Sequence, residues 1–280
     1  MNIRPSSVSD HCTRLNVPDR LYYDQDGKDG EHAISPNDVR QGLIGNCYFL
    51  AALAAIAQSN PSYIQSIVKP LGNDTWAVKL YEKEWWSGWY KPVEIIVGRD
   101  DLLTTGALQM YIKPDNTRWV SDDKSGCRSM ELWPSIIEAA FHKMKRGGGM
   151  DGGLPWSAFR TLTGYGGVVN SLPTSSPAEV KRRLERGEAV VVRTGPFDRW
   201  RSGPSRLPEQ HAMMVKDVSQ RADKHGKLEW IYTIYDQATG RDIQIGQAQL
   251  ERETYGFMTL NIPPPRPSLP PPSSPRPIAR

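Results

Sequence analysis

Residues 41–57 read QGLIGNCYFLAALAAIA, and this stretch places a cysteine at the start of an apolar, alanine-rich run. Residues 48–57 contain no Gly or Pro and are mostly Ala and Leu, which have the highest helix propensities. Asn46 precedes the cysteine and is a favoured N-cap residue, so we expect Cys47 in the first turn of a helix. The partial positive charge of a helix N-terminus favours the thiolate and lowers the pKa of such a cysteine.

The residues before Cys47 also suit a nucleophile. Gly42 and Gly45 let the backbone approach a substrate closely. Gln41 offers a side-chain amide that, together with a backbone N–H, can form an oxyanion hole. The alternative is a small buried cysteine in a core helix, because unpaired Cys is among the most buried residue types. The flanking residues favour the reactive thiol.

The motif around Cys47 resembles the active-site signature of calpain-type cysteine proteases. In that signature Gln, two Gly and an acidic or amide residue lead into Cys, an aromatic residue and an apolar run. Three further stretches resemble the same family, and the resemblance covers roughly residues 21–261. They are ELWPSIIEAAFHKMK with the glycine-rich segment after it, PAEVKRRLERGEAVVVRT, and QHAMMVKDV.

This resemblance implies an α+β, papain-like fold of two lobes with a cleft between them, acting on protein substrates. We expect an irregular extension (1–20), a helical lobe with the cysteine (21–165), a β-rich lobe with the histidine and the acid (166–262), and a tail (263–280). Gly152 and Gly153 match the position where the cleft wall of the family runs beside the substrate backbone.

Charge argues against a nucleic-acid partner. The formal net charge is +4, but Arg266, Arg276 and Arg280 in the C-terminal tail supply three of these charges. Nucleic-acid binding would need Lys and Arg clustered on one face. The tail has nine prolines in its last 18 residues, so we expect an extended segment that is a candidate ligand for an SH3-like partner.

The sequence also bears on the compartment. No run approaches 18 apolar residues, so we expect no transmembrane helix and no membrane partner. The N-terminus lacks the apolar region of a Sec signal peptide. Cys12, Cys47 and Cys127 do not make a disulfide framework, which suits a reducing compartment. We expect a cytoplasmic protein, or one exported by a route without a Sec signal.

The hydrophobic pattern predicts the elements of the first lobe. Residues 75–100 alternate around a Gly turn like an antiparallel hairpin, and we expect its tryptophans to pack within the lobe. They are Trp76, Trp85, Trp86 and Trp89. Residues 130–145 have the apolar stripe of a core-facing helix, with His142 on its polar side beside Glu138.

In the second half of the chain the pattern changes. The glycine-rich segment 147–167 should break regular structure and cross between the lobes. From Val168 onward we expect mostly strands, with one helix over 177–186 that ends at Gly187.

A nucleophilic cysteine needs a base within hydrogen-bond reach and a group that orients the base. His211 is the candidate base, because it opens the strand-like run HAMMVKDV, and a second such run, EWIYTIYD, follows after a polar loop. If the strands pair with Val218 opposite Glu229, His211 lies opposite Asp236, with Cβ atoms about 5 Å apart on one face. The carboxylate would then hold one imidazole nitrogen while the other faces the thiol.

The chain departs from the family at the third catalytic position. Calpains carry Asn followed by Pro-Trp-Gly, whereas residues 235–240 here read YDQATG. Asp236 can orient the imidazole as Asn does, but the family's shielding Trp is absent. Cys-His-Asp is also the arrangement of transglutaminase-like acyltransferases and deamidases. These enzymes are therefore one alternative to an endopeptidase, and a catalytically idle interaction module with a docking tail is another.

No metal is needed for this chemistry, and the sequence does not support a calcium requirement. The acidic lead-in before Gln41 is not an EF-hand, because Lys28 stands where the third oxygen ligand is required. The family's calcium-binding loops in the protease core have no recognisable match in this chain.

Overall fold

The computed structural model describes residues 21–22, 34–103, 117–119, 128–145, 150–171, 176–195, 206–222 and 225–262, with only the backbone at 103, 117–119, 128–130 and 170–171. The expected N-terminal extension and proline-rich tail, together with Lys28, Cys12 and Cys127, lie outside these residues.

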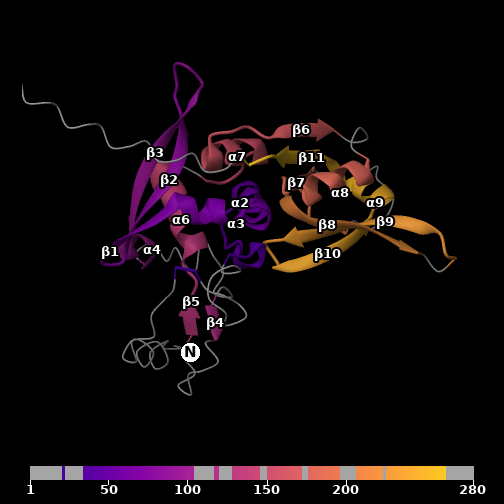
Figure 1. Cartoon of the computed structure of the whole chain (residues 1–280), viewed down its shortest axis with the longest axis horizontal. Coiled ribbons are helices and arrows are strands. Elements are labelled where there is room, and N and C mark those ends of the chain that lie inside the picture. Colours follow the sequence, from indigo (N-terminus) through magenta and orange to yellow (C-terminus); the bar gives the residue numbers. More distant parts are fainter. Residues whose placement is uncertain are drawn as a thin grey trace, which may run out of the picture.

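The first part of the chain combines helices with two small antiparallel sheets, β1-β2-β3 and β4-β5 (Figure 1). Its elements are the 3-10 helix η1 (Pro36–Asp38), α2 (Cys47–Ser59), α3 (Pro61–Ile67), β1 (Val68–Gly72), β2 (Thr75–Lys83), β3 (Tyr90–Gly98), α4 (Arg99–Leu103), β4 (Thr117–Trp119), β5 (Arg128–Met130), α6 (Trp133–Met144) and α7 (Pro155–Thr163).

The second part is built on a six-stranded sheet in the order β10-β9-β8-β7-β11-β6, and every pairing in it is antiparallel. Its elements are β6 (Val168–Ser171), α8 (Pro177–Glu185), β7 (Ala189–Thr194), β8 (Ala212–Ala222), β9 (Leu228–Asp236), β10 (Arg241–Gly246), α9 (Gln247–Glu253) and β11 (Thr254–Leu260). The expected α+β class is confirmed.

Helix α2 lies inside the molecule, because it is apolar on every side. All residues from Tyr48 to Ala57 are buried, and a helix without a polar face has to be covered all round. One side of α2 contacts α3 and α7, and the other contacts β7 and β8. Phe49 also stacks on Phe141 of α6. The core around α2 is therefore shared by both parts of the chain, and Cys47 lies at one end of this helix.

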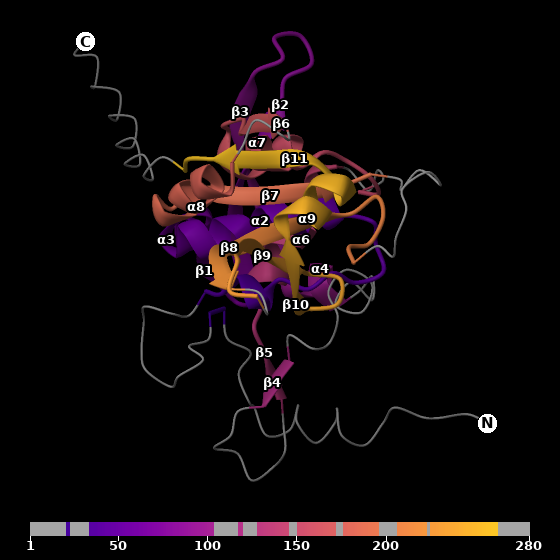
Figure 2. The ribbon, with the colours of Figure 1, turned by 90° about the vertical axis from the view of Figure 1, so that its right-hand side faces the viewer.

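The large sheet buries apolar side chains on both faces. Along β7, Val191 joins the core around α2, whereas Val190 and Val192 join a second core with α8 and α9. This alternation follows from the two-residue period of a strand. Figure 2 shows β11, β7 and β8 stepped across the molecule, with α8 and α9 on the near side and α2 behind.

Several sequence predictions for the elements are confirmed, with small shifts. The predicted helix over 130–145 begins at Trp133, with Pro134 in its first turn. The helix over 177–186 is α8, and Gly187 after it has φ of 73°. Two predictions are wrong: the glycine-rich segment contains the regular helix α7, and β10 is followed by a further helix, α9. Both helices are short, and neither has a side-chain hydrogen bond at its N-cap, so the usual sequence signal of a capping residue is missing.

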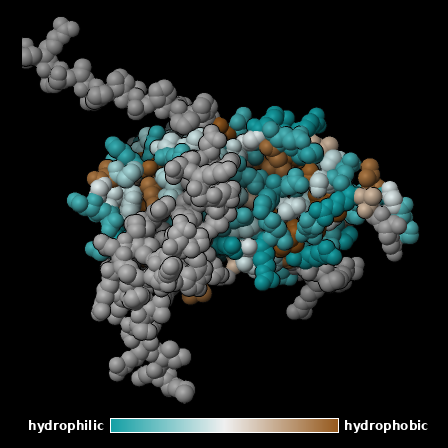
Figure 3. Space-filling view, turned by 60° about the horizontal axis from the view of Figure 1, so that its bottom comes forward, coloured by the Kyte–Doolittle hydropathy of each residue, from teal (hydrophilic) through white to brown (hydrophobic). Residues whose placement is uncertain are grey.

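The hairpin of β2 and β3 is confirmed, but the expected packing of its tryptophans is wrong for three of the four. Trp76 is buried in β2, whereas Trp85, Trp86 and Trp89 are 88%, 64% and 78% exposed at the tip. The tip projects beyond the other described elements in Figure 1, which agrees with the exposure of these three rings. On the face seen in Figure 3 the described surface is mostly polar, with separate small apolar spots.

Candidate active site

Cys47 is the first residue of α2 and a free thiol, half-buried at the edge of the core. The N–H groups of the first helical turn have no partners within the helix, so this end of α2 presents backbone donors. Two backbone N–H groups, those of Tyr48 and Ala212, stabilise the thiolate. The predicted position of Cys47 at a helix N-terminus is confirmed.

His211 lies immediately before β8 and close to both Cys47 and Asp236. Its Nε2 is 3.0 Å from Asp236 Oδ1, at the end of β9. Its ring also hydrogen-bonds the thiol of Cys47, and Nδ1 is the nitrogen that the bond to Asp236 leaves for this contact. The chain turns sharply just before His211, since Gln210 has φ of 49°, a value that non-glycine residues rarely adopt.

The predicted strand register is wrong, although the two side chains meet. Val218 lies opposite Tyr232 and not opposite Glu229. A bulge between Val215 and Asp217 then shifts the pairing by one residue. The pairing of Met214 with Tyr235, extended by one residue, places Asp236 opposite Met213. His211 is two residues from Met213, so its side chain projects from the same face of the sheet as those of Met213 and Asp236. Such diagonal neighbours are within reach of long side chains.

The bulge decides whether this contact forms. A one-residue shift moves a strand's side chains to the opposite face. Without the extra residue, the pairing seen beyond the bulge would place Asp236 across from Met214, and His211 would then project from the other face. A bulge inside a predicted strand leaves no signal in the alternation of HAMMVKDV.

The carboxylate of Asp236 is buried and held by several donors. Besides the imidazole, its Oδ1 accepts a hydrogen bond from the backbone N–H of Ala238, and its Oδ2 accepts one from Thr239 Oγ1. Burial raises the pKa of Asp236, but the hydrogen bonds from His211, Thr239 and Ala238 outweigh burial and lower it. The side chain is therefore a fixed anion beside the imidazole.

The pKa values of the thiol and the imidazole move toward an ion pair. Burial raises the pKa of Cys47, but the hydrogen bond and charge of His211 and the two backbone N–H groups lower it below its ordinary value. Burial lowers the pKa of His211, but Asp236 and Cys47 together raise it to about 9. At neutral pH this favours a thiolate beside an imidazolium.

Gln237, the residue after Asp236, is a buried contact residue that connects the segments around the thiol. Its side chain is fully buried, and its Nε2 donates to the carbonyl oxygens of Cys47, at 3.1 Å, and Ala212, at 2.6 Å. The backbone carbonyl of Gln237 accepts a hydrogen bond from the backbone N–H of Gln41 at 2.8 Å. One residue therefore connects the start of α2, the start of β8 and the loop before the cysteine. Its position next to Asp236 is the signal that could have indicated it.

Asn46 occupies the N-cap position, but its side chain does not cap the helix. Its Nδ2 donates a very short hydrogen bond to Oε1 of Glu138 in α6. Glu138 was expected on the polar side of α6 and is instead fully buried, which raises its pKa to about 8 despite the bond from Asn46. Its position one turn before Phe141, on the apolar stripe, was the available signal.

The other predicted residues surround the loop before Cys47. Gln41 Nε2 donates a hydrogen bond to the carbonyl of Ile44 at 2.7 Å. The side-chain amide of Gln41 has two N–H donors, and this bond uses one of them. The backbone N–H of Gly152 donates to the carbonyl of Gly45 at 2.9 Å. Gly153 lies against the ring of Tyr48, where an added Cβ would be 2.5 Å from ring carbons. These contacts place both glycines beside the cysteine loop, and their role in substrate binding stays a prediction.

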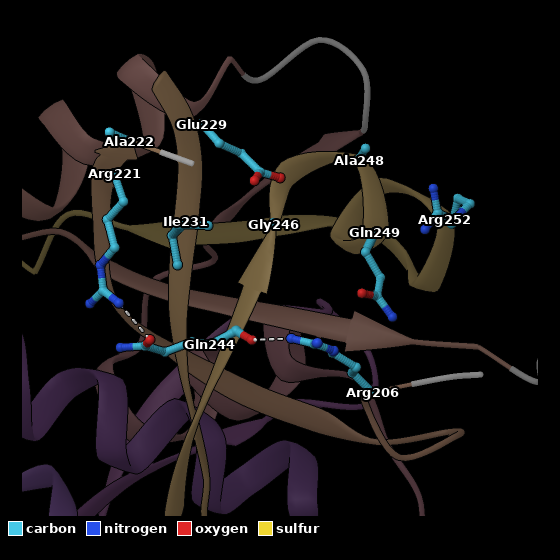
Figure 4. A pocket seen from close by; sticks show the side chains of 10 residues that line it. All are labelled: Arg206, Arg221, Ala222, Glu229, Ile231, Gln244, Gly246, Ala248, Gln249 and Arg252. Carbon is cyan, nitrogen blue, oxygen red and sulfur yellow. Dashed lines mark hydrogen bonds between the residues drawn. The ribbon is translucent and has the colours of Figure 1, made fainter. Parts of the chain in front are cut away.

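Among the side chains that the structure describes, no group of three or more His, Cys, Asp or Glu is placed to hold a metal ion. A hollow of about 510 Å³ lies elsewhere, between β8, β9, β10 and α9 (Figure 4). Two of its arginines, Arg206 and Arg221, hydrogen-bond Gln244. None of the predicted catalytic residues lines this hollow.

A mixed α/β fold that sets a free cysteine at a helix N-terminus, beside a histidine held by a buried carboxylate, defines the class of papain-like cysteine proteases. The sequence comparisons give the family within this class. The family profile of calpain family cysteine proteases matches residues 28–232. The chain therefore belongs to the calpain family.

Individual relatives are distant and longer. The chain is 32% identical to Calpain clp-4 of Caenorhabditis elegans over 155 residues, which is 54% of this chain and 19% of that protein. It is 28% identical to Calpain-13 of Rattus norvegicus over 208 residues, 69% of this chain and 28% of that protein. It is also 28% identical to Calpain-5 of Caenorhabditis elegans over 115 residues, 39% of this chain and 15% of that protein. The matched regions are thus a small part of these relatives.

Proposed function

We propose that this calpain-family chain is a cysteine endopeptidase in which Cys47, His211 and Asp236 act as a catalytic triad. The single observation that carries the proposal is the chain of contacts from the thiol through the imidazole to the buried carboxylate, 3.0 Å from the ring. In this arrangement the thiolate is the resting nucleophile, and Asp236 keeps the ring in one orientation.

In the proposed reaction the Cys47 sulfur attacks the carbonyl carbon of a peptide bond. His211 gives its proton to the leaving amine nitrogen as the C–N bond breaks, which leaves a thioester on the cysteine. A water molecule then attacks the thioester, and His211 accepts a proton from this water. The acid is released and the thiolate–imidazolium pair is restored. Each step uses side chains and backbone groups of this chain.

The oxyanion of the tetrahedral intermediates would be held at the start of α2. The backbone N–H of Cys47 is at the N-terminal end of the helix, where it has no partner in the helix. The second N–H of Gln41 is the proposed side-chain donor, since the bond to Ile44 occupies only one. The bond to Ile44 also fixes this amide. One such donor contributes about 3 kcal/mol to transition-state stabilisation.

Thiol labelling tests the nucleophile directly. Iodoacetamide at near-neutral pH, followed by peptide mapping, should modify Cys47 far faster than Cys12 or Cys127. His211→Ala should slow the labelling of Cys47, because the imidazolium that stabilises its thiolate is gone. Equal rates for the three cysteines of the folded protein would contradict the proposal and would also support an idle interaction module.

The carboxylate at position 236 is the observation that favours a second candidate, an acyltransferase or deamidase acting on glutamine side chains. Both activities would use the same thioester, so labelling does not separate them. Incubation with a casein substrate does: an endopeptidase creates new N-termini, whereas a deamidase releases ammonia without them. Cys47→Ala is the control for both measurements, since either activity should disappear with the thiol.

A further inference from the structure

The tip of the β2–β3 hairpin carries the largest exposed aromatic side chains among the described residues. Trp85, Trp86 and Trp89 lie within five consecutive positions, and each is at least 64% exposed. Trp85 and Trp86 meet edge to face, with ring centroids 5.7 Å apart. These rings are absent from both hydrophobic cores of the described residues, and an exposed aromatic cluster of this kind marks an interaction surface.

We infer that this hairpin tip binds the interfacial region of a phospholipid bilayer, with the three tryptophan rings inserted at the level of the headgroups. The inference is independent of the proposed peptidase activity. It concerns the turn between β2 and β3, which contains none of the proposed catalytic residues, and it needs no membrane-spanning segment. No helix of the described residues is long and apolar enough to cross a membrane.

Part of the backbone of the hairpin tip is hydrogen-bonded within the turn. Unpaired N–H and C=O groups are costly in an apolar medium, so a segment that inserts has to satisfy them internally. Here the N–H of Glu84 donates to the carbonyl of Trp89 at 2.8 Å, and the N–H of Gly88 donates to the carbonyl of Glu84 at 2.9 Å. The N–H of Trp89 donates to the hydroxyl of Ser87 at 3.1 Å. These bonds pair three backbone N–H groups of the turn, those of Glu84, Gly88 and Trp89, within the turn itself.

The charge of the tip is also compensated. Glu84 accepts a hydrogen bond from Ser87 Oγ at 2.9 Å and forms an ion pair with Lys91 at 3.6 Å. The ammonium of Lys91 also lies 5.9 Å from the ring centroid of Trp86. Lys83 and Lys91 flank the tip on its two strands, where long side chains can reach phosphate groups while the rings lie deeper.

The shape of the tip favours a bilayer over a folded protein partner. A stable protein interface buries about 800 Å² on each side, usually on a broad surface. In Figure 1 the β2–β3 hairpin ends in a narrow turn that projects beyond the other described elements, and the three rings of this turn are each at least 64% exposed. A fluid interface can close around such a projection, and Trp prefers this region because it combines an apolar ring with one N–H donor.

Vesicle co-sedimentation of the full chain tests the inference. We expect the wild-type chain to associate with vesicles of phosphatidylcholine and, to a similar degree, with an equimolar mixture of phosphatidylcholine and phosphatidylserine. Trp85→Ser combined with Trp86→Ser and Trp89→Ser should abolish the association, with about a tenfold loss in partition coefficient for each ring removed. Leu228→Ser, which removes a 61% exposed apolar side chain from another hairpin, is the matched control and should change nothing.

Two outcomes would overturn the inference. One is a wild-type chain that sediments with neither kind of vesicle. The other is a triple variant that still sediments with wild-type affinity, which would place the lipid contact elsewhere. The melting temperature and the labelling rate of Cys47 should be unchanged in the triple variant, because the three rings are exposed. If the triple variant does not fold, Trp85→Ser alone, at the most exposed ring, gives the same test with a smaller loss.

Discussion

The residues around the thiol are held by a small number of buried polar contacts. Asp236 accepts hydrogen bonds from His211 and from two groups of its own turn, and Gln237 joins the carbonyls of Cys47 and Ala212. Buried polar groups that lose a partner are costly, since they cannot turn to water. Substitutions at these positions should therefore affect both the geometry and the pKa values of the proposed triad.

At Asp236, we expect Asn to retain measurable activity and Ala to lose about a hundredfold in kcat/KM, about 3 kcal/mol of transition-state stabilisation. Asn still accepts a hydrogen bond from the imidazole, whereas Ala lets the ring rotate. Peptidase assays of the two variants beside wild type provide the comparison. A wild-type rate in Asp236→Ala would remove Asp236 from the proposed triad.

The pH profile gives a separate prediction for the same carboxylate. The imidazolium is lost as pH rises through the pKa of His211, about 9, so the alkaline limb of kcat/KM should lie near that value. The hydrogen bond and charge of Asp236 raise this pKa, so Asp236→Asn should move the alkaline limb to lower pH. A limb that stays in place would show that Asp236 does not act on the imidazole.

Gln237→Ala should reduce both stability and the labelling rate of Cys47. The substitution removes the shared donor of two carbonyls, which costs on the order of 1–3 kcal/mol. It also releases the start of α2 from the start of β8. Gln58→Ala is the matched control, because Gln58 Nε2 donates to the carbonyl of Lys216 in β8, near the other end of α2. The control should lose stability and label at the wild-type rate; equal labelling in both variants would contradict the positioning role.

Among the elements, α6 contributes a buried carboxyl group to the end of α2. Glu138 bonds Asn46, the residue before the cysteine, and its Oε2 has no partner in the described structure. Burial raises the pKa of Glu138 from 4.5 to about 8, so the folded protein keeps a proton that the unfolded chain releases. Stability should therefore fall as pH rises from the unfolded value toward about 8, because the folded state binds more protons over this window.

Glu138→Gln should remove this part of the pH dependence, which is on the order of a few kcal/mol, because a Gln side chain does not titrate. Melting temperatures at about pH 5 and about pH 8 measure the effect. The wild-type chain should lose more stability between the two conditions than the variant. Glu185→Gln, at a surface carboxylate paired with Lys181, should behave as wild type. A parallel decline in Glu138→Gln and wild type would contradict a buried neutral carboxyl.

At the scale of the whole molecule, β11 completes the large sheet between β7 and β6, close to the end of the described chain. Leu260 and Ile262 are buried in the core around α2, and Thr259 Oγ1 accepts a hydrogen bond from Arg183 of α8. The proline-rich tail begins directly afterwards, and its composition cannot support a packed core. Folding should therefore depend on the chain up to Ile262.

A chain that ends at Ile262 should melt and turn over like the full chain. A chain that ends at Met258 should melt roughly 5 °C lower or more, because it loses two buried aliphatic side chains and the end of β11. Calorimetry of the two truncations makes the comparison. Any SH3-like partner binding should be lost in both, since both lack the tail. If the chain that ends at Ile262 is as destabilised as the chain that ends at Met258, the tail contributes to the fold.

What the sequence determined by itself was local. The propensity and apolarity of residues 48–57, with Asn46 and Cys47 before them, were sufficient to predict helix α2 and the thiol at its start. The alternation of two strand-like runs was sufficient to bring His211 and Asp236 into one hairpin. Periodicity along one segment carries this information, because it depends on neighbours in the chain.

The tertiary structure decided the remainder. The bulge between Val215 and Asp217 sets the face on which His211 lies, and it depends on how two strands pair. The burial of Glu138 and Gln237 depends on α6 and β9 meeting the start of α2, and the exposure of Trp85 depends on where the other described elements pack relative to the hairpin tip. Burial and register are properties of contacts between distant segments, and a single segment's sequence does not contain them.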